Sequence, residues 1–221
     1  MSQLQSALDA FKKGDLIIVT DDADRENEGD LFILASKATA EKVAFMVRHT
    51  TGILCVAMTQ DRARHLRLPL MVEENQDSKK TAFTVSVDYK VGITTGVSAA
   101  ERAKTARALA NDIAAHSDFI RPGHVYPLIA DKGGLRARRG HTEAGVALAQ
   151  LVGAAPLTLL SEIVAEDGSM ARGQSLIDFA TQYSIPMVSI QELIDIAPVV
   201  EEVGSDYEFV WANLPLHSGM W

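Results

Sequence analysis

The sequence contains a single cysteine, Cys55, among its 221 residues. One cysteine excludes an intramolecular disulfide. Residues 1–4 lack the basic stretch and apolar run of a secretory signal. The longest apolar stretch, residues 148–164, is interrupted by Gly153, Pro156 and Glu162, so it does not have the pattern of a membrane span. We therefore expect a cytoplasmic protein that does not insert into a membrane.

The chain has fewer basic residues than acidic ones. The chain has 21 Lys and Arg against 29 Asp and Glu, which gives a formal net charge of -8. This charge opposes nonspecific attraction to nucleic acid, although a local basic pocket remains compatible with it. We expect no nucleic-acid partner.

Linkers rich in Gly, Ser or Pro are absent, and so are low-complexity tracts. With 47% hydrophobic residues the chain can bury a substantial core. The sequence thus predicts one continuous domain over residues 1–197. Residues 198–221 differ, because acidic and aromatic residues occur there without a clear period. This tail could cover the domain, bind a partner or begin a further region.

Several catalytic motifs are missing as well. The sequence has no nucleophilic-serine motif and no glycine-rich nucleotide loop followed by lysine. Cys55 has no basic neighbour that could activate it. The sequence therefore does not support the interpretation that the protein is an ordinary hydrolase or a kinase.

The apolar residues that are present predict strands and helices in a mixed order without a repeat unit. Thr39 can cap a helix, and Ser98 with Glu101 and Ser189 with Glu192 have the spacing of a capping box. Helices are expected at 4–11, 39–49, 98–114, 142–152, 175–183 and after 189, and strands at 16–19, 31–35, 53–58, 83–88, 125–129 and 158–163.

An acidic loop lies between the first two predicted strands. Mutual repulsion makes such a cluster costly unless a cation or full hydration compensates. Magnesium prefers hard oxygen ligands, whereas zinc typically recruits Cys and His together, and the spacing does not match a calcium loop. The alternative is a solvated acidic turn. Arg25 could neutralise a neighbour or bind an anionic substrate. The carboxylates are Asp21, Asp22, Asp24, Glu26, Glu28 and Asp30.

A basic turn, residues 136–143, opens a predicted helix and suits a phosphate group. A nucleic-acid patch is the competing interpretation, but the turn is short and has no interleaved aromatics. His141 lies in this turn, and His124 ends a rigid turn before an apolar strand. The other four histidines have no comparable setting.

Glu162 interrupts an apolar strand, where a buried carboxylate must be paired or have a raised pKa. It could act as a general base. Thr94 and Thr95 could bond substrate hydroxyls, although such turns also occur without any active site.

Five short segments carry most of these side chains in order: Asp21–Asp30, Gly92–Ala100, Arg121–His124, Gly140–Ala144 and Asp167–Arg172. Together they resemble 3,4-dihydroxy-2-butanone 4-phosphate synthase, and the likeness extends from about Leu4 to Ile196. The resemblance implies an α+β fold, a single domain with a mixed sheet and surrounding helices. It also implies a homodimer with active sites at the subunit interface. The implied reaction converts ribulose 5-phosphate to 3,4-dihydroxy-2-butanone 4-phosphate and formate, a step of riboflavin synthesis.

The resemblance also implies residue roles. Glu26 and His141 would hold magnesium, with manganese as a substitute. His124 and Glu162 would be essential to catalysis, and Glu28 and Cys55 would act beside them. The substrate would be bound by Arg25, Glu26, Asp30, Thr95, Arg138, Arg139, Gly140, His141, Thr142 and Glu162.

Departures from the family pattern occur at Arg139, where a glycine is common, and at Gly145, which softens the following helix. In some relatives a cyclohydrolase-type domain follows, so the chain is either a stand-alone synthase or the front part of a two-domain protein. Two alternatives remain. One is an inactive module that dimerises and binds phosphate; the other is a different magnesium-dependent sugar-phosphate isomerase or lyase, which product identity would distinguish.

Overall fold

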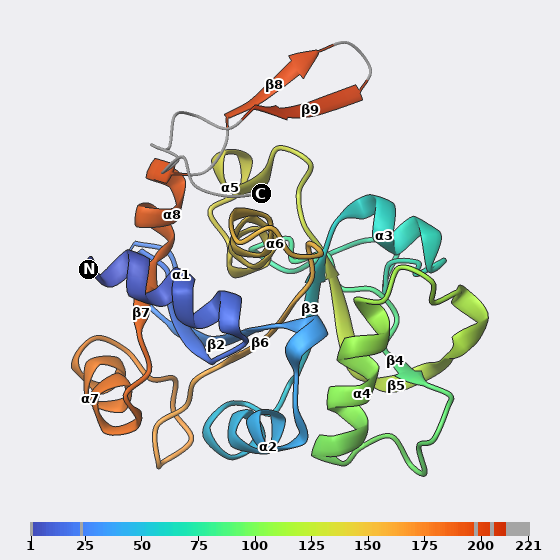
Figure 1. Cartoon of the computed structure of the whole chain (residues 1–221), viewed down its shortest axis with the longest axis horizontal. Helices are drawn as coiled ribbons and strands as arrows, with labels where there is room; N and C mark the ends of the chain where they lie inside the picture. Colours follow the sequence, from blue (N-terminus) through green and yellow to red (C-terminus); the bar gives the residue numbers. More distant parts are fainter. Residues whose placement is uncertain (1, 23, 197–198, 204–205, 211–221) are drawn as a thin grey trace, which may run out of the picture.

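The computed structural model of the chain describes residues 2–22, 24–196, 199–203 and 206–210. Its main feature is a seven-stranded mixed sheet with the strand order β4-β5-β3-β6-β2-β1-β7 (Figure 1). The predicted mixed sheet with surrounding helices is confirmed. The strands are β1 (Ile17–Thr20), β2 (Gly29–Leu34), β3 (Cys55–Met58), β4 (Val87–Tyr89), β5 (Phe119–Ile129), β6 (Thr158–Glu162) and β7 (Met187–Ser189).

Helices cover both faces of the sheet (Figure 1). One buried apolar cluster joins α1, α6 and α8 to one face, and a second joins α2, α4 and α7 to the other. The helices are α1 (Gln3–Lys13), α2 (Ala40–His49), α3 (Gln60–His65), α4 (Ala99–Leu109), α5 (Gly134–Ala137), α6 (His141–Leu151), α7 (Gln174–Tyr183) and α8 (Ile190–Ile196), with short 3-10 turns η1 (Ala35–Lys37) and η2 (His116–Asp118).

The residues of β2 show why the sheet has two buried faces. Phe32 and Leu34 belong to the cluster with α1, α6 and α8, whereas Leu31 and Ile33 belong to the cluster with α2, α4 and α7. Successive side chains of a strand point to opposite faces. A continuous apolar run therefore serves both cores, as expected for a strand covered on both sides.

Strand pairing brings distant residues to one end of the sheet. The acidic loop connects β1 to β2, which pair as antiparallel neighbours. Next to them β2 pairs with β6, and Asp30 stands opposite Glu162. The following strand, β3, pairs with β6 so that Cys55 stands opposite Leu160. Asp30, Glu162 and Cys55 thus come from three adjacent strands.

The predicted helix caps are confirmed. Thr39 caps α2, and the hydroxyl of Ser98 and the carboxylate of Glu101 exchange hydrogen bonds with each other's backbone N–H groups at the start of α4. Ser189 and Glu192 make the same exchange before α8. These signals are correct because a cap depends on side chains within three residues of the helix start.

Several predicted boundaries are wrong. The helix predicted to reach residue 114 ends at Leu109, where an Asn-Asp pair and a further turn follow. The strand predicted from residue 125 begins six residues earlier, at Phe119. The predicted strand 83–88 is observed only as Val87–Tyr89, and Phe83 and Thr84 form isolated bridges. Its polar residues Thr84, Ser86 and Asp88 are buried, because β5 and its hydrogen-bonding groups cover them. The apolar Phe83 and Val85 are only partly buried.

Helix α6 lies against the sheet over most of its length, and its residues from His141 to Ala149 are all buried. Gly145 makes this close approach feasible. A Cβ added there would lie 3.1 Å from the Cβ atoms of both Ala57 and Thr158. The glycine that softens helix propensity thus lets α6 rest on the sheet, which fixes His141 at the end of the sheet that carries the acidic loop.

The tail contains β8 (Val199–Val203) and β9 (Asp206–Val210), which pair as an antiparallel two-stranded sheet. The sequence pattern did not predict this hairpin. Trp211 and Trp221, two of the aromatic residues that distinguish the tail, lie outside the described residues. Within the part of the chain that the structure describes, no helix combines the length and the apolar character that crossing a membrane requires.

Candidate active site

Asp21 organises the acidic loop. Its carboxylate accepts hydrogen bonds from the backbone N–H groups of Glu28 (2.8 Å) and Glu26 (3.1 Å). The N–H of Asp21 in turn donates to the carbonyl of Glu28 (3.2 Å). Asp21 is buried, so a solvated acidic turn does not describe it. The loop is a folded connection in which one carboxylate sets the positions of two others.

Arg25 partly neutralises this cluster. Its Nη1 lies 2.8 Å from Oδ2 of Asp21 and 2.7 Å from Oε2 of Glu26. The first of the two expected roles for Arg25, neutralising a neighbour, is thus observed. The side chain of Arg25 remains 18% exposed and borders the adjoining cavity, where it can meet an anionic group.

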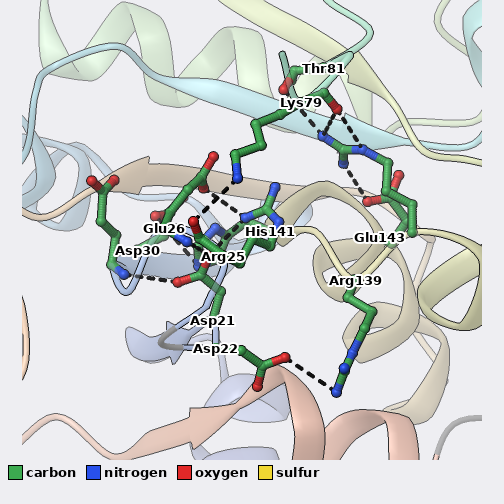
Figure 2. Close-up of polar contacts among 12 residues, drawn as sticks. Asp21, Asp22, Arg25, Glu26, Asp30, Lys79, Thr81, Arg139, His141 and Glu143 are labelled. Carbon is green, nitrogen blue, oxygen red and sulfur yellow. Dashed lines mark hydrogen bonds and ion pairs between the residues drawn. The ribbon is translucent and has the colours of Figure 1, made fainter.

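Three potential metal ligands converge beside the loop (Figure 2). One ligand atom from each of Asp21, Glu26 and His141 lies within 4.8 Å of the other two. Magnesium holds its ligands at about 2.1 Å, so two ligands of one ion lie at most about 4.2 Å apart, and small side-chain shifts would close the set. The structure brings the predicted pair Glu26 and His141 together. It adds Asp21, to which the sequence pattern assigns no separate role.

The ring of His141 suits a cation ligand. Its Nε2 is buried and has no hydrogen-bond partner among the described residues, and the carbonyl of Val19 bonds the ring. Burial lowers the pKa of His141 to about 4, although the charge of Asp21 opposes this shift. The imidazole is therefore neutral at pH 7, and the Nε2 lone pair is available to a divalent cation.

Asp30 presents a second buried atom to the same space. Its Oδ1 has no hydrogen-bond partner among the described residues and lies 3.8 Å from Nε2 of His141, too far for a hydrogen bond. Burial raises the pKa of Asp30 well above its ordinary value, and the charges of neighbouring carboxylates, first Glu162 and then Glu26, raise it further. The site thus holds a carboxyl group that favours its protonated form until a cation or a donor arrives.

Glu162 corrects one sequence expectation. It was expected to be buried inside its strand, but its side chain is exposed, because Glu162 is the last residue of β6 and borders the cavity. Partial desolvation nevertheless raises its pKa, with the charges of Glu28 and Glu26 adding to the shift and a bond from Thr51 opposing it. A carboxyl group with a raised pKa that faces a cavity is a candidate for exchanging protons with a bound substrate.

Cys55 is buried at the base of the cavity, as expected from its strand. Burial raises the pKa of its thiol, and the charges of Asp30 and Glu162 raise it further. The thiol therefore stays protonated. It can line the site and donate a weak hydrogen bond, but the structure does not favour a thiolate nucleophile.

A cavity of about 120 Å³ lies between the acidic loop, the end of the sheet and the start of α6. Apolar and hydroxyl side chains, among them Ile53, Phe83 and Ser161, form part of its wall. The predicted site residues that border it are Arg25, Glu26, Asp30, Cys55, Arg138, His141, Thr142 and Glu162.

Arg138 borders the cavity and is held in place by several contacts. Its Nη1 lies 2.6 Å from Oε2 of buried Glu143, and its Nε and Nη2 donate to the carbonyl of Lys79 (3.3 and 3.2 Å). Nη2 also donates to the hydroxyl of Thr81 (3.2 Å). A Cβ at Gly140 would lie 2.3 Å from Nη1 of Arg138, so glycine is required for this arrangement. The guanidinium is thus preorganised next to the N-terminus of α6, a setting that favours anions.

Two long-range contacts tie the acidic loop to the rest of the fold. The Nζ of Lys79 donates to the carbonyl of Arg25 (3.2 Å). Arg172 forms an ion pair with the carboxylate of Glu28 and donates from Nε to the carbonyl of Glu26 (3.2 Å). Sequence analysis did not identify Lys79, because a contact to a backbone carbonyl leaves no pattern in the sequence. The Asp167–Arg172 segment was one of the five that carry the family resemblance, and the contacts of Arg172 with the acidic loop account for its place among them.

Five predicted site residues are not among the described residues that border the cavity: Glu28, Thr95, His124, Arg139 and Gly140. Arg139 points elsewhere and lies 3.2 Å from Oδ2 of Asp22 (Figure 2). Thr95 is exposed in the loop before α4. His124 lies on β5, where its Nδ1 is 2.7 Å from Oδ2 of Asp88. Within one chain, therefore, most of the predicted residues lie at or next to the cavity, whereas His124 and Thr95 lie in a separate region. The roles of all these residues stay predictions.

Replacing Asp30 with Asn should stabilise the protein in the presence of a metal chelator while abolishing activity. A raised native-state pKa means that the wild-type fold loses stability as pH rises from the ordinary carboxyl value through the raised one. The Asn variant lacks this titration, so the difference should grow with pH. At pH 8 we expect this gain in stability to be clear, because the ionised carboxylate is the form that burial disfavours. Urea denaturation with EDTA at several pH values measures it.

Asp167→Asn is the matched control for this experiment. Asp167 is exposed in a turn, and hydrogen bonds from Ser169 lower its pKa. Its replacement should therefore leave stability at pH 8 unchanged or slightly reduced. An Asp30→Asn variant that is less stable than wild type at every pH would contradict the assignment of Asp30 as a strained carboxyl group.

The chain was compared with known proteins. The family model described as 3,4-dihydroxy-2-butanone 4-phosphate synthase matches residues 5–196. A protein named as this synthase from Chromobacterium violaceum is 47% identical over 193 residues, which cover 87% of this chain and 92% of that protein. One from Agrobacterium fabrum is 45% identical, with 92% and 96% covered.

A crystal structure titled as this synthase in complex with two magnesium ions superposes with a TM-score of 0.84 at 44% identity, covering 88% of this chain and 96% of that one. The riboflavin biosynthesis protein RibBA of Chlamydia muridarum is 46% identical, and there the chain spans only 46% of the relative's length. From this match and the preceding geometry, the chain belongs to the 3,4-dihydroxy-2-butanone 4-phosphate synthase family of riboflavin biosynthesis.

Proposed function

We propose that the protein converts ribulose 5-phosphate to 3,4-dihydroxy-2-butanone 4-phosphate and formate, as a magnesium-dependent carbon–carbon lyase of the cytoplasm. The observation that carries this proposal is a cavity bordered by two unlike groups of side chains. Glu26 and His141 border this cavity with the potential ligand Asp21 beside them, and Arg138 borders it next to the start of α6. A sugar phosphate has matching ends, a polyol that chelates a cation and a phosphate that binds a guanidinium.

The donor set fits magnesium better than zinc. It offers carboxylate oxygens and one imidazole nitrogen but no thiolate, since the thiol of Cys55 stays protonated. Manganese accepts the same ligands and is the expected substitute. When bound to substrate oxygens, the metal would acidify the carbon next to the carbonyl and stabilise negative charge on oxygen. Glu26 and His141 would hold it, with Asp21 as a third ligand or as the anchor of Glu26.

The proposed reaction needs several proton transfers: removal next to a carbonyl, loss of water, a skeletal shift and release of one carbon as formate. Glu162 is suited to take and return protons because its pKa is raised and it faces the cavity. Glu28 is positioned close enough to influence it. General acid–base groups contribute about a hundred- to ten-thousandfold each. Arg138 and Thr142 would bind the phosphate and keep the substrate oriented.

We further propose that the enzyme is a homodimer whose active sites lie between subunits. His124 and Thr95 are expected to act on substrate, yet neither is among the described residues that border the cavity of their own chain. The ring of His124 is 42% exposed, and Thr95 is exposed in a neighbouring loop. A second subunit that presents these side chains to the cavity would complete the site.

Incubation with ribulose 5-phosphate and magnesium is the direct test. We expect formate and the four-carbon phosphate in equal amounts, both abolished by EDTA and restored by added magnesium. Binding of the substrate without product would instead support an inactive phosphate-binding module. A product formed without formate would indicate a different sugar-phosphate enzyme. Either of these results would refute the proposal.

A further inference from the structure

We propose that Asp88 is a positioning residue that fixes the tautomer and orientation of His124. This inference rests on the proposed function insofar as it assigns His124 to catalysis. The carboxylate of Asp88 receives two hydrogen bonds from the same residue. Its Oδ1 accepts from the backbone N–H of His124 at 2.9 Å, and its Oδ2 lies 2.7 Å from Nδ1 of the ring.

The chemistry of this pair determines where the ring proton sits. An ionised carboxylate only accepts hydrogen bonds, so Nδ1 must carry the proton and donate it to Asp88. The lone pair of the neutral ring is then on Nε2. The side chain of Asp88 is 5% exposed, whereas that of His124 is 42% exposed. The carboxylate thus forms the buried support, and the ring presents its reactive nitrogen outward.

The segment of β5 that contains His124 packs closely against residues 86–88. The N–H of Gly123 donates to the hydroxyl of Ser86 (3.1 Å), which precedes Asp88 by two residues. A Cβ at Gly123 would lie 2.0 Å from the carbonyl carbon of Val87 and 2.3 Å from the nitrogen of Asp88. Only glycine permits this approach. The position of the backbone therefore fixes the distance between His124 and Asp88.

The loop that precedes α4 also lies against this carboxylate. Gly96 has a φ of +85°, and a Cβ there would lie 2.1 Å from Oδ2 of Asp88. Thr95 is the neighbouring residue. Asp88 therefore sits between the His124 ring and the loop that carries Thr95. His124 and Thr95, two of the predicted site residues that do not border the cavity, thus lie in one local cluster with Asp88.

The positive charge of Arg102 acts on the same cluster. Burial lowers the pKa of Arg102, and the negative charge of Asp88 opposes that shift. The guanidinium of Arg102 donates to the carbonyl of Gly52 (3.1 Å), which keeps it on the buried side of the cluster. The arrangement resembles the general pattern in which a buried carboxylate orients a histidine that acts as acid or base.

The test uses Asp88→Asn in the full-length protein, labelled with ¹⁵N-histidine. The signals of His124 are identified by their loss in His124→Asn. In the wild type we expect Nδ1 to be protonated and Nε2 to be unprotonated when the ring is neutral. In Asp88→Asn the amide oxygen can keep the backbone bond and turn its NH2 group to the ring, so we expect the proton to move to Nε2.

Kinetics give the second readout. With the tautomer reversed, kcat for ribulose 5-phosphate should fall about a hundredfold, while KM should stay within about threefold, because the defect lies in proton transfer rather than in binding. Ser86→Ala is the matched control. It removes a hydrogen bond to the same turn but leaves the acceptor of the ring, so the tautomer should be unchanged and kcat should fall by no more than about threefold.

Three results would overturn the inference: an unprotonated Nδ1 in the wild type, an unchanged kcat in Asp88→Asn, or a large loss of kcat in that variant with the wild-type tautomer retained. The last would show that the loss is structural. The tautomer measurement uses no substrate. A protein that makes no formate would refute the proposed reaction and still leave the Asp88–His124 pairing to be decided by the spectra.

Discussion

Two inactive variants, Glu162→Gln and His124→Asn, should together regain about a quarter of wild-type activity when their subunits are mixed at equal amounts. The reason is the separation of the predicted residues within one chain. Glu162 borders the cavity, whereas His124 is paired with Asp88 and is not among the described residues that border it. If each site takes Glu162 from one subunit and His124 from the other, a mixed dimer has one site with both defects and one intact site.

Random exchange makes about half of the dimers mixed, and half of their sites are intact, which gives the expected quarter. The two variants would carry different affinity tags, and mixed dimers would be obtained by co-expression. Formate release per subunit is the measurement. Glu162→Gln mixed with Glu26→Gln is the matched control, because both residues border the same cavity of one chain. In that pairing every site carries a defect, so no activity should return.

Lack of recovery in the first mixture, with dimers verified by their two tags, would refute the proposed interface site. Recovery in the control mixture would show that Glu26 and Glu162 act in different sites, against the geometry of the cavity. The experiment therefore tests the assembly and the grouping of residues together.

Removing either predicted metal ligand should have the other large effect. In His141→Ala and in Glu26→Gln we expect kcat to fall at least about a thousandfold, since a divalent cation contributes several kcal/mol to stabilising oxyanions. The Nε2 of His141 is buried and without a hydrogen-bond partner among the described residues, and the pKa of the ring is lowered to about 4. Replacing His141 therefore removes the neutral nitrogen ligand of the proposed metal site.

Calorimetric titration with magnesium and with manganese separates this effect from simple misfolding. Both variants should lose most of their metal affinity while keeping the wild-type circular dichroism spectrum. His65→Ala serves as the control, because His65 is exposed on α3 and does not border the cavity. Unchanged metal binding in His141→Ala would rule out the proposed ligand set even if activity were lost.

Asp21 combines two structural roles. Its carboxylate lies near Glu26 and His141 as a third potential ligand, but it also accepts the backbone hydrogen bonds that shape the acidic loop. Geometry alone gives it both parts. The backbone role was not foreseeable from composition, since six carboxylates in one short segment look alike until the loop is folded.

Local features were well predicted. The caps at Thr39, Ser98 and Ser189 lie where expected, because each depends on side chains and backbone groups within three residues. Strands β1 and β2 follow from short apolar runs on either side of a polar loop. The grouping of the acidic loop with the basic turn was suggested by family resemblance, not by any local pattern.

Long-range features were decided by the tertiary structure. Glu162 is exposed rather than buried, because strand β6 ends at that residue and the cavity opens beside it. The polar face of residues 84–88 is buried, because β5 supplies partners such as the N–H groups of Gly123 and His124. Neither outcome can be read from alternation, since a polar side chain is buried only where a distant segment brings a partner.

The sequence by itself determined where the capped helices start, where most of the longer strands lie, and which side chains are available for chemistry, but it did not reveal the short elements α3, α5 and β7. Those properties depend on neighbours a few residues apart. Only the tertiary structure decided that Asp30 stands opposite Glu162, that His141 meets the acidic loop, and that Asp88 supports His124. These contacts depend on the register of paired strands and on the position of α6 against the sheet, and both are set by the packing of the whole domain.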